Sequence, residues 1–371
     1  MAEERDSTRK LTEGRPMGLI IGFSLPILIG MLFQQFYSLV DTIIVGKCLG
    51  VDALAAVGST GSVNFMILGF CMGVCSGFAI PIAQQFGAGN QVSLRRYVAG
   101  AVWLSAVFAI VLTVIVCLLC RRILVWMQTP DNISHQAYDY IIVIFVGIPV
   151  TCLYNLTAGI MRSLGDSRTP VYFLLLASVI NIVLDFLLIA GLHFGVEGAA
   201  YATVFSQLVA GIGCLFYIKK KFPMLRLQKE DWQLRPTYIW NLCSMGVPMG
   251  LQYSITAIGS VLLQSAVNGL GSDVVAANTA AAKLSMFVVC PFDALGSAMA
   301  TYGGQNIGAG KIKRTKEGLK AATFLGGIYS VLAFLLLFFV GKYLLLLFLS
   351  AEDTVILSNA GQFLLVQAAF Y

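Results

Sequence analysis

Charged residues are scarce in this sequence. They make up 11% of the 371 residues, whereas 58% are hydrophobic, and a typical soluble domain has about 25% charged residues. Apolar runs long enough to cross a lipid bilayer, which takes about 20 residues as a helix, recur along the chain. The scarcity of charge therefore excludes an ordinary soluble domain and favours an integral membrane protein.

Residues that carry out catalysis are scarce as well. The sequence has two histidines, and it has no nucleophile paired with a base, no phosphate-binding loop and no cluster of metal ligands. Nine cysteines are scattered along the chain, and the CxxC spacing of Cys117 and Cys120 has no second pair that would complete a metal site. A polytopic membrane enzyme is an alternative from a different functional class, but it would need a catalytic constellation that the sequence does not offer.

The apolar runs predict helices rather than strands. Only helices and closed β-barrels cross a bilayer, because every backbone polar group in lipid needs a partner. Barrel strands alternate in polarity over about ten residues, whereas residues 171–191 are apolar almost throughout. The sequence predicts about ten helices, at residues 17–46, 53–80, 94–120, 136–162, 170–191, 197–218, 237–264, 273–300, 317–341 and 357–371.

Basic residues are unevenly divided between the two ends of these helices. One end has 19 of them: Arg5, Arg9, Lys10, Arg15, Arg95, Arg96, Arg162, Arg168, Lys219, Lys220, Lys221, Arg226, Lys229, Arg235, Lys311, Lys313, Arg314, Lys316 and Lys320. The other end has four: Lys47, Arg121, Arg122 and Lys342. Because cytoplasmic loops are enriched in lysine and arginine, we expect a cytoplasmic N-terminus. This distribution also accounts for the net charge of +6 without a nucleic-acid partner.

A repeat divides the chain into two halves. Residues 84–89 resemble residues 305–310, and residues 49–52 resemble residues 270–273, both at an offset of 221 residues. Six predicted helices precede the basic segment 219–236, so the two halves would point the same way and be related by a pseudo-two-fold axis along the membrane normal. The expected parts are a cytoplasmic tail (1–16), a first lobe of six helices (17–218), a cytoplasmic linker (219–236) and a second lobe (237–371). The second lobe would hold four of its six helices, so we expect a chain truncated at its C-terminus.

Ionisable residues within the predicted helices are candidates for function, because they are costly in lipid. Gln34, Tyr37, Ser38 and Asp41 are spaced i, i+3, i+4 and i+7, so they share one face of the first helix. Pro26 lies earlier in that helix and removes a backbone hydrogen bond, which makes it a candidate hinge. A polar seam that only holds helices together is the alternative reading of this face.

Further polar residues follow on later helices. Asn181 precedes Asp185 by one turn, and Thr203 and Asn155 lie within the neighbouring predicted helices. Carboxylate, amide and hydroxyl oxygens suit a hard cation such as Na⁺, and a pair of carboxyl groups suits a proton equally well.

One predicted helix of the second half carries both a base and an acid, Lys283 and Asp293. Ten residues separate them, about 15 Å along a helix, so they cannot pair directly. Lys283 is expected to face the interior of the second half, and Asp293 to lie closer to the cytoplasmic end of its helix.

As a set, these features resemble the multidrug and toxic compound extrusion (MATE) family, in its DinF-like prokaryotic branch. They are Pro26 with Asp41, the segments 84–89 and 304–310, the segment 162–170, and Asn181 with Asp185. The resemblance implies two lobes of six helices around a central cleft. It also implies export of small organic compounds, cationic or polar-aromatic, in exchange for H⁺ or Na⁺.

The resemblance also implies roles for residues. Asp41, Asn181, Asp185 and Thr203 would form the cation site and would be the ligands of Na⁺, with no structural metal and no cofactor besides the coupling ion. Gln34, Tyr37, Tyr140 and Asn155 would line the adjoining substrate cavity, to which we add Lys283. The expected protein is a monomer in the plasma membrane of a bacterium or archaeon. A flippase for lipid-linked oligosaccharides is an alternative within the same superfamily, but it would need a cationic cavity, whereas the expected cavity is acidic.

Overall fold

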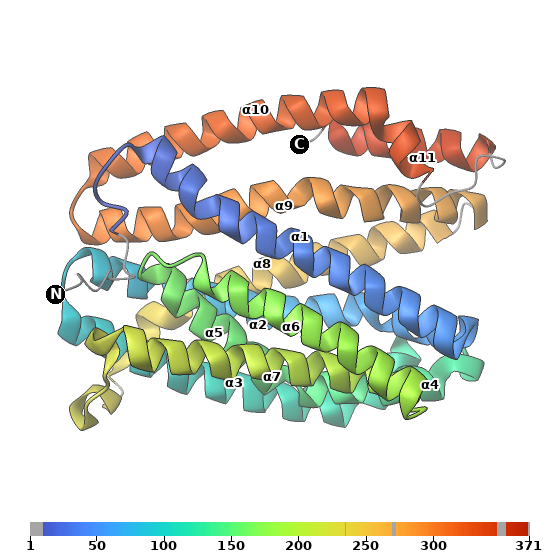
Figure 1. Cartoon of the computed structure of the whole chain (residues 1–371), viewed down its shortest axis with the longest axis horizontal. Coiled ribbons are helices and arrows are strands. Elements are labelled where there is room, and N and C mark those ends of the chain that lie inside the picture. The colour runs from blue at the N-terminus through green and yellow to red at the C-terminus, as the bar shows by residue number, and fades with distance from the viewer. Residues whose placement is uncertain (1–9, 234, 269–271, 347–353, 370–371) are drawn as a thin grey trace.

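The computed structural model is a bundle of long helices, and it describes residues 10–233, 235–268, 272–346 and 354–369 (Figure 1). The α-helices are α1 (Pro16–Leu49), α2 (Val51–Gly87), α3 (Gln91–Trp126), α4 (Asp131–Val146), α5 (Ile148–Ser163), α6 (Thr169–Asp185), α7 (Val196–Lys221), α8 (Pro236–Asn268), α9 (Ser272–Gly308), α10 (Ile312–Leu345) and α11 (Thr354–Ala368). A π-helical segment, η1 (Phe186–Gly191), continues α6, and two short 3-10 turns, η2 (Pro223–Leu225) and η3 (Lys229–Trp232), precede α8. No strand occurs among the described residues, which confirms the predicted all-α class.

Eight of the described helices are long and apolar enough to cross a bilayer individually. Large apolar side chains such as Leu118, Val125 and Phe216 are exposed on the outside of the bundle, as expected where lipid is the solvent. All ten predicted segments are helical where the structure describes them. However, α11 has 15 residues, fewer than the roughly 20 that a span needs.

The predicted continuous helix 136–162 is wrong. The structure divides this span into α4 and α5, which meet at Gly147 with a bend of 44°. Pro149 in the first turn of α5 explains the break, because proline has no N–H and its ring collides with the carbonyl of the preceding turn. Gly147 lies directly against Val204 of α7, and a side chain at this position would collide with it.

Consecutive helices alternate in direction, so the loops gather at two ends of the bundle (Figure 1). One end, which we call the basic end, carries the N-terminal segment and the connections α2–α3, α5–α6, α7–α8 and α9–α10. These connections and their flanks contain most of the lysines and arginines.

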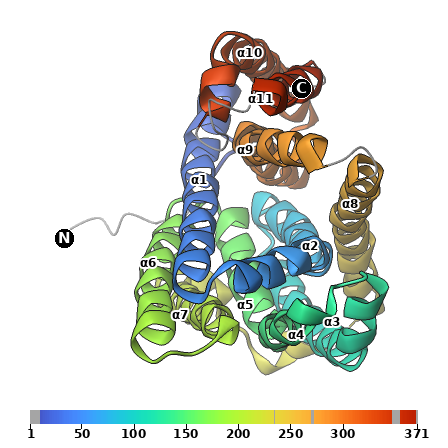
Figure 2. The same cartoon turned by 90° about the vertical axis from the view of Figure 1, so that its right-hand side faces the viewer.

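Helix contacts follow the offset found in the sequence, in which α1 corresponds to α8 and α2 to α9. Helix α1 packs against α9, and α8 packs against α2 (Figure 2). Likewise α1 contacts α10, and α8 contacts α3. Each contact is the counterpart of the other, which is the pattern that a two-fold relation between the two halves produces.

Helices α2 and α8 pack especially closely. Gly73 faces the backbone of Met249 and Gly250, and Gly77 faces that of Met245 and Gly246. A Cβ at Gly73 or Gly77 would lie closer than 3.0 Å to these backbone atoms. The glycine stripe of α2 therefore has a packing role, since small residues allow membrane helices to approach closely.

Candidate functional site

Two acidic residues meet inside the first half of the chain. Asp41 lies on α1, and Asp185 is the last residue of α6, where the helix passes into η1. Their carboxyl groups are in direct contact. Asp185 is 0% exposed, and Asp41 is partly buried. Gly30 helps to bring α1 and α6 together, because a Cβ there would already be 3.1 Å from Val171 Cγ2 on α6.

Asn181 and Thr203 extend this site toward α7. Asn181 is 1% exposed and lies one turn before Asp185. Its Nδ2 donates a hydrogen bond to Thr203 Oγ1 at 3.4 Å. The four residues expected to form the cation site are therefore connected, through contact, helical spacing and a hydrogen bond.

Several oxygens of this site lack a hydrogen-bond donor. Among the described residues, none donates to either carboxyl oxygen of Asp185, to Asp41 Oδ1 or to Asn181 Oδ1. Two ionised carboxylates offer acceptors only, so the pair meets without a donor between its members. Buried charge that is left unpaired is costly. A proton or a cation held between the carboxyl groups would satisfy them.

The donor set also restricts which cation would fit. No group of three or more His, Cys, Asp or Glu residues able to hold a metal occurs in the described ranges. Two carboxylates, an amide oxygen and a hydroxyl are hard oxygen ligands, which suit Na⁺ rather than a thiophilic transition metal. The same carboxyl oxygens could take up a proton.

Two tyrosines border the carboxyl pair, as the sequence predicts. Tyr37 lies one turn before Asp41 on α1, and its hydroxyl is hydrogen-bonded to the side chain of Gln34. Tyr140 on α4 is 8% exposed and interacts electrostatically with Asp41, Asp185 and Tyr37. Together they give the acidic pair aromatic and hydroxyl-bearing neighbours.

Two other predicted cavity residues lie elsewhere. Asn155 on α5 donates its side-chain amide to the carbonyl of Thr151, in its own helix, at 2.8 Å. Lys283 is exposed on α9 and lines a separate cavity of about 380 Å³, together with Gln35 and Ser38 of α1. Lys283 is therefore not next to the carboxyl pair. The predicted hinge, Pro26, lies within α1, which runs as one helix through it.

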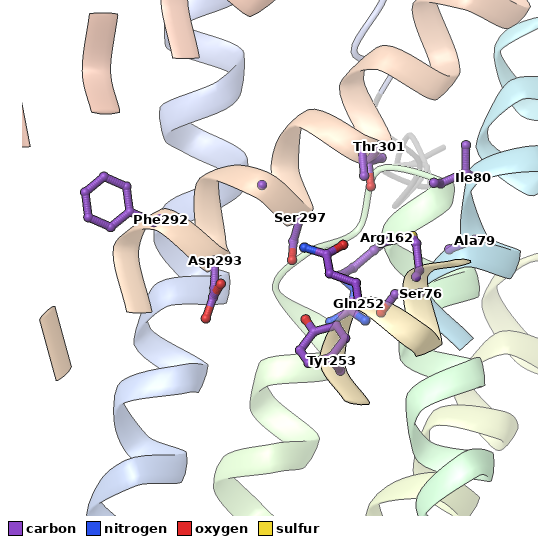
Figure 3. A pocket seen from close by; sticks show the side chains of 13 residues that line it. Ser76, Ala79, Ile80, Arg162, Gln252, Tyr253, Phe292, Asp293, Ser297 and Thr301 are labelled. Atoms are coloured by element: carbon purple, nitrogen blue, oxygen red, sulfur yellow. The ribbon is translucent and has the colours of Figure 1, made fainter. Parts of the chain in front are cut away.

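A cavity between the two halves was missed from the sequence. It measures about 260 Å³, and its charged lining residues are Arg162 of α5 and Asp293 of α9 (Figure 3). Arg162 was counted with the bases of the connections, and Asp293 was ranked below the other acids. The two come from different halves of the chain, so no spacing within one helix could have connected them.

At the basic end, the two halves close tightly on each other. Gly87 of α2 lies against the carbonyl of Gln305, and Gly308 of α9 lies against the carbonyl of Gln84. Gln305 is 0% exposed, accepts a hydrogen bond from the backbone N–H of Leu11 at 2.8 Å, and donates one to the carbonyl of Ser163 at 2.8 Å. We call this region the seal.

Comparison with known proteins gives consistent matches. The MatE family model matches residues 26–187 and 248–371. The probable multidrug resistance protein YpnP of Bacillus subtilis is 31% identical over 364 residues, which cover 97% of this chain and 80% of that protein. YoeA of the same species, also described as a probable multidrug resistance protein, is 30% identical over 344 residues, 91% of this chain and 74% of that protein. An FAD transporter of Shewanella oneidensis is 28% identical over 363 residues, 96% of this chain and 79% of that protein.

Solved structures show the same fold. An outward-facing multidrug resistance MATE family transporter superposes with a TM-score of 0.91 at 24% identity, covering 100% of this chain and 82% of that chain. A MOP superfamily transporter from Pyrococcus furiosus superposes with a TM-score of 0.90 at 24% identity, covering 99% of this chain and 83% of that chain. That second structure is described as having a binding pocket of reversed polarity, which suggests a different function for it.

Proposed function

The chain belongs to the MatE family and is a multi-pass membrane transporter rather than an enzyme, and on this basis we propose that it exports small organic compounds by exchange for H⁺ or Na⁺ at Asp41 and Asp185. The observation that carries the proposal is the contact between two buried carboxyl groups to which no described residue donates a hydrogen bond. Relatives at 30% and 31% identity are described as probable multidrug resistance proteins, which supports the substrate class.

The proposed exchange follows from competition for one negative site. When Asp41 and Asp185 are ionised, the site attracts a cationic substrate, and Tyr37 and Tyr140 offer aromatic faces to it. A proton or Na⁺ bound between the carboxyl groups, with Asn181 and Thr203 as further ligands, removes that attraction. The two ligands thereby favour different states, and a coupling free energy of about 1–3 kcal/mol is sufficient.

We further propose how the molecule sits in the membrane. The excess of basic residues at the basic end supports a cytoplasmic N-terminus and a plasma-membrane location. The closed seal would then separate the cavities from the cytoplasm, so the conformation would be outward-facing. Opening the seal would need the lobes, divided at 219–236, to move apart, with Pro26 as a bending point in α1. One chain supplies every residue of the cation site, which supports a monomer.

Transport in proteoliposomes tests this function. The purified protein would be supplied with a fluorescent organic cation and with H⁺ and Na⁺ gradients imposed separately. We expect gradient-driven transport in the parent protein and at least a tenfold loss in both Asp41→Asn and Asp185→Asn, because each substitution keeps the shape of the side chain and removes its charge. Asp52→Asn, at an exposed acid at the start of α2, is the matched control. Lys283→Met should have a milder effect, since this residue lies apart from the carboxyl pair.

Folding is checked by gel filtration and by thermal melting of each variant. If Asp41→Asn and Asp185→Asn are folded and transport at the parent rate under both gradients, the carboxyl pair is not the coupling site. If Lys283→Met alone abolishes transport, coupling belongs to the second half.

A further inference from the structure

The cavity between the two halves has a floor and two chemically different walls. Ser76 of α2 and Arg162 of α5 face it from the first half, and Tyr253 of α8 and Asp293 of α9 face it from the second (Figure 3). Arg162 is followed in the chain by Ser163, whose carbonyl accepts the hydrogen bond from Gln305. The cavity therefore lies next to the seal, and it depends on both halves of the chain.

Opposite charges face this cavity without neutralising each other. Arg162 and Asp293 form no ion pair within 4.0 Å, either with each other or with other described residues. Tyr253 senses the charge of both and lies between them. Figure 3 shows Asp293 at one side of the cavity and Arg162 at the other, with Gln252 and Tyr253 in the space that separates them.

An unpaired guanidinium within a membrane bundle calls for a partner. Charged side chains at membrane depth are costly unless they are paired or hydrated. Arg162 is partly buried, and no hydrogen bond of its guanidinium to another described residue is seen. A guanidinium presents a planar fork of donors that matches a carboxylate or phosphate. Arg162 thus provides a site for an anionic group, and Asp293 provides one for a cation.

The remaining lining suits a polar ligand with an apolar body. Gln252, Ser297 and Thr301 offer hydrogen-bonding groups, while Tyr253 and Phe292 offer aromatic surface. The volume of about 260 Å³ is at the lower limit of ligand pockets, which span roughly 300–1,000 Å³. The cavity is therefore large enough for a small zwitterion, or for the charged part of a larger one.

Given the export function proposed above, we propose that this cavity binds amphoteric substrates, with a carboxylate or phosphate on Arg162 and an amine directed to Asp293. This site is separate from the carboxyl pair and widens the substrate class from cations to zwitterions. Because its two charged residues come from different halves, opening the seal pulls the two anchors apart. Substrate release is thereby connected to the movement of the halves.

Two forms of one dye test the proposal. The first is a rhodamine with a free carboxylate, which is a zwitterion, and the second is its methyl ester, which is a cation of nearly the same shape. Binding to the purified full chain is measured by fluorescence polarisation. We expect the parent protein to bind the zwitterion about tenfold or more tightly than the ester. Arg162→Gln should weaken zwitterion binding about 10- to 100-fold, the usual range for loss of a charged hydrogen-bonded partner, and should leave ester binding within about twofold.

Controls separate this site from general effects of charge and folding. Arg168→Gln removes an exposed arginine of the α5–α6 connection that does not line the cavity, and it should bind both dyes like the parent. Asp293→Asn should weaken binding of both dyes, because both carry the cation. Unchanged ester binding shows that Arg162→Gln is folded.

The outcomes distinguish this proposal from the export function. If the parent binds the ester as tightly as the zwitterion, or if Arg162→Gln keeps the parent's preference, the anionic subsite does not exist. This first comparison needs no variant, so it holds even if Arg162→Gln does not fold. Gradient-driven transport of the ester, lost in Asp185→Asn, would uphold the export function in either case. Absence of that transport would overturn the export function instead.

Discussion

The seal at the basic end can be perturbed at a single atom. In Gly308→Ala, the added Cβ would lie closer than 3.0 Å to the carbonyl oxygen of Gln84 on α2. The obstacle is backbone, so no side-chain rotation relieves the overlap. Gly303 lies on the same helix, and a Cβ there has no neighbour within 4 Å. Gly303→Ala is therefore the matched control, with the same chemical change and no collision.

The expected magnitude follows from overpacking. Forcing an extra methyl group into a closely packed contact typically costs about 1–3 kcal/mol. The collision exists only where α2 and α9 touch, so the cost falls on the closed seal and is absent when the two halves separate. A difference of 1–3 kcal/mol shifts a two-state equilibrium about 5- to 150-fold. Gly308→Ala should therefore populate an open basic end that is rare in the parent protein.

Distance measurements between spin labels would detect this shift. Gln91 and Lys313 are exposed at the basic ends of α3 and α10, and both can be labelled in a cysteine-free background that still transports. We expect a single short-distance population for the parent and for Gly303→Ala, and an additional longer distance for Gly308→Ala. A parent-like distribution for a folded Gly308→Ala protein would refute the assignment of this contact as a seal.

Two further predictions concern the same end of the molecule. Leu11 is 1% exposed and its N–H donates to Gln305; Leu11→Ala should destabilise the protein by about 2–5 kcal/mol, lower its melting temperature and add the longer distance in the labelling experiment. Burial would raise the pKa of Asp231, but hydrogen bonds from the backbone N–H of Gln228 and from Arg95 outweigh burial and hold this pKa below its ordinary value. A lowered folded-state pKa contributes stability that is present above the unfolded value of about 3.9 and is lost as the pH falls through the folded value. Asp231→Asn should therefore melt at a lower temperature than the parent at pH 7, by about 1 kcal/mol in stability, with a difference that shrinks below about pH 4; a difference independent of pH would contradict this.

The sequence predicts helices better than it predicts where they bend. Apolar runs locate all ten helical segments, because a bilayer requires long apolar helices. The break at Gly147 has a local signal in Pro149, but the surrounding run 136–162 is rich in apolar residues on both sides of it. Hydrophobicity does not distinguish one continuous span from two helices that meet at an angle, so the break follows from proline chemistry and from the contact with Val204.

The two candidate sites differ in how far the sequence indicates them. Periodicity places Asp41 on a polar face of α1, and its meeting with Asp185 was expected from the family resemblance, since spacing within a helix does not determine which helices touch. Arg162 and Asp293 had no such guide. Each is an isolated charge in its own helix, and only the packing of the two halves brings both to one cavity.

The motif that reveals the repeat is also the place where the halves touch. Residues 84–89 and 305–310 are matched in sequence, and in the structure Gly87 lies against Gln305 while Gly308 lies against Gln84. A two-fold axis brings equivalent surfaces into contact with each other, so a glycine and a glutamine carbonyl at matched positions produce two equal contacts. A side chain at either glycine would separate both, because the contacts share the same pair of helices. The two halves differ in their additional links, since Gln305 also holds Leu11 and Ser163. Opening the basic end must therefore break the symmetric contact and these hydrogen bonds together, which makes the seal a cooperative unit.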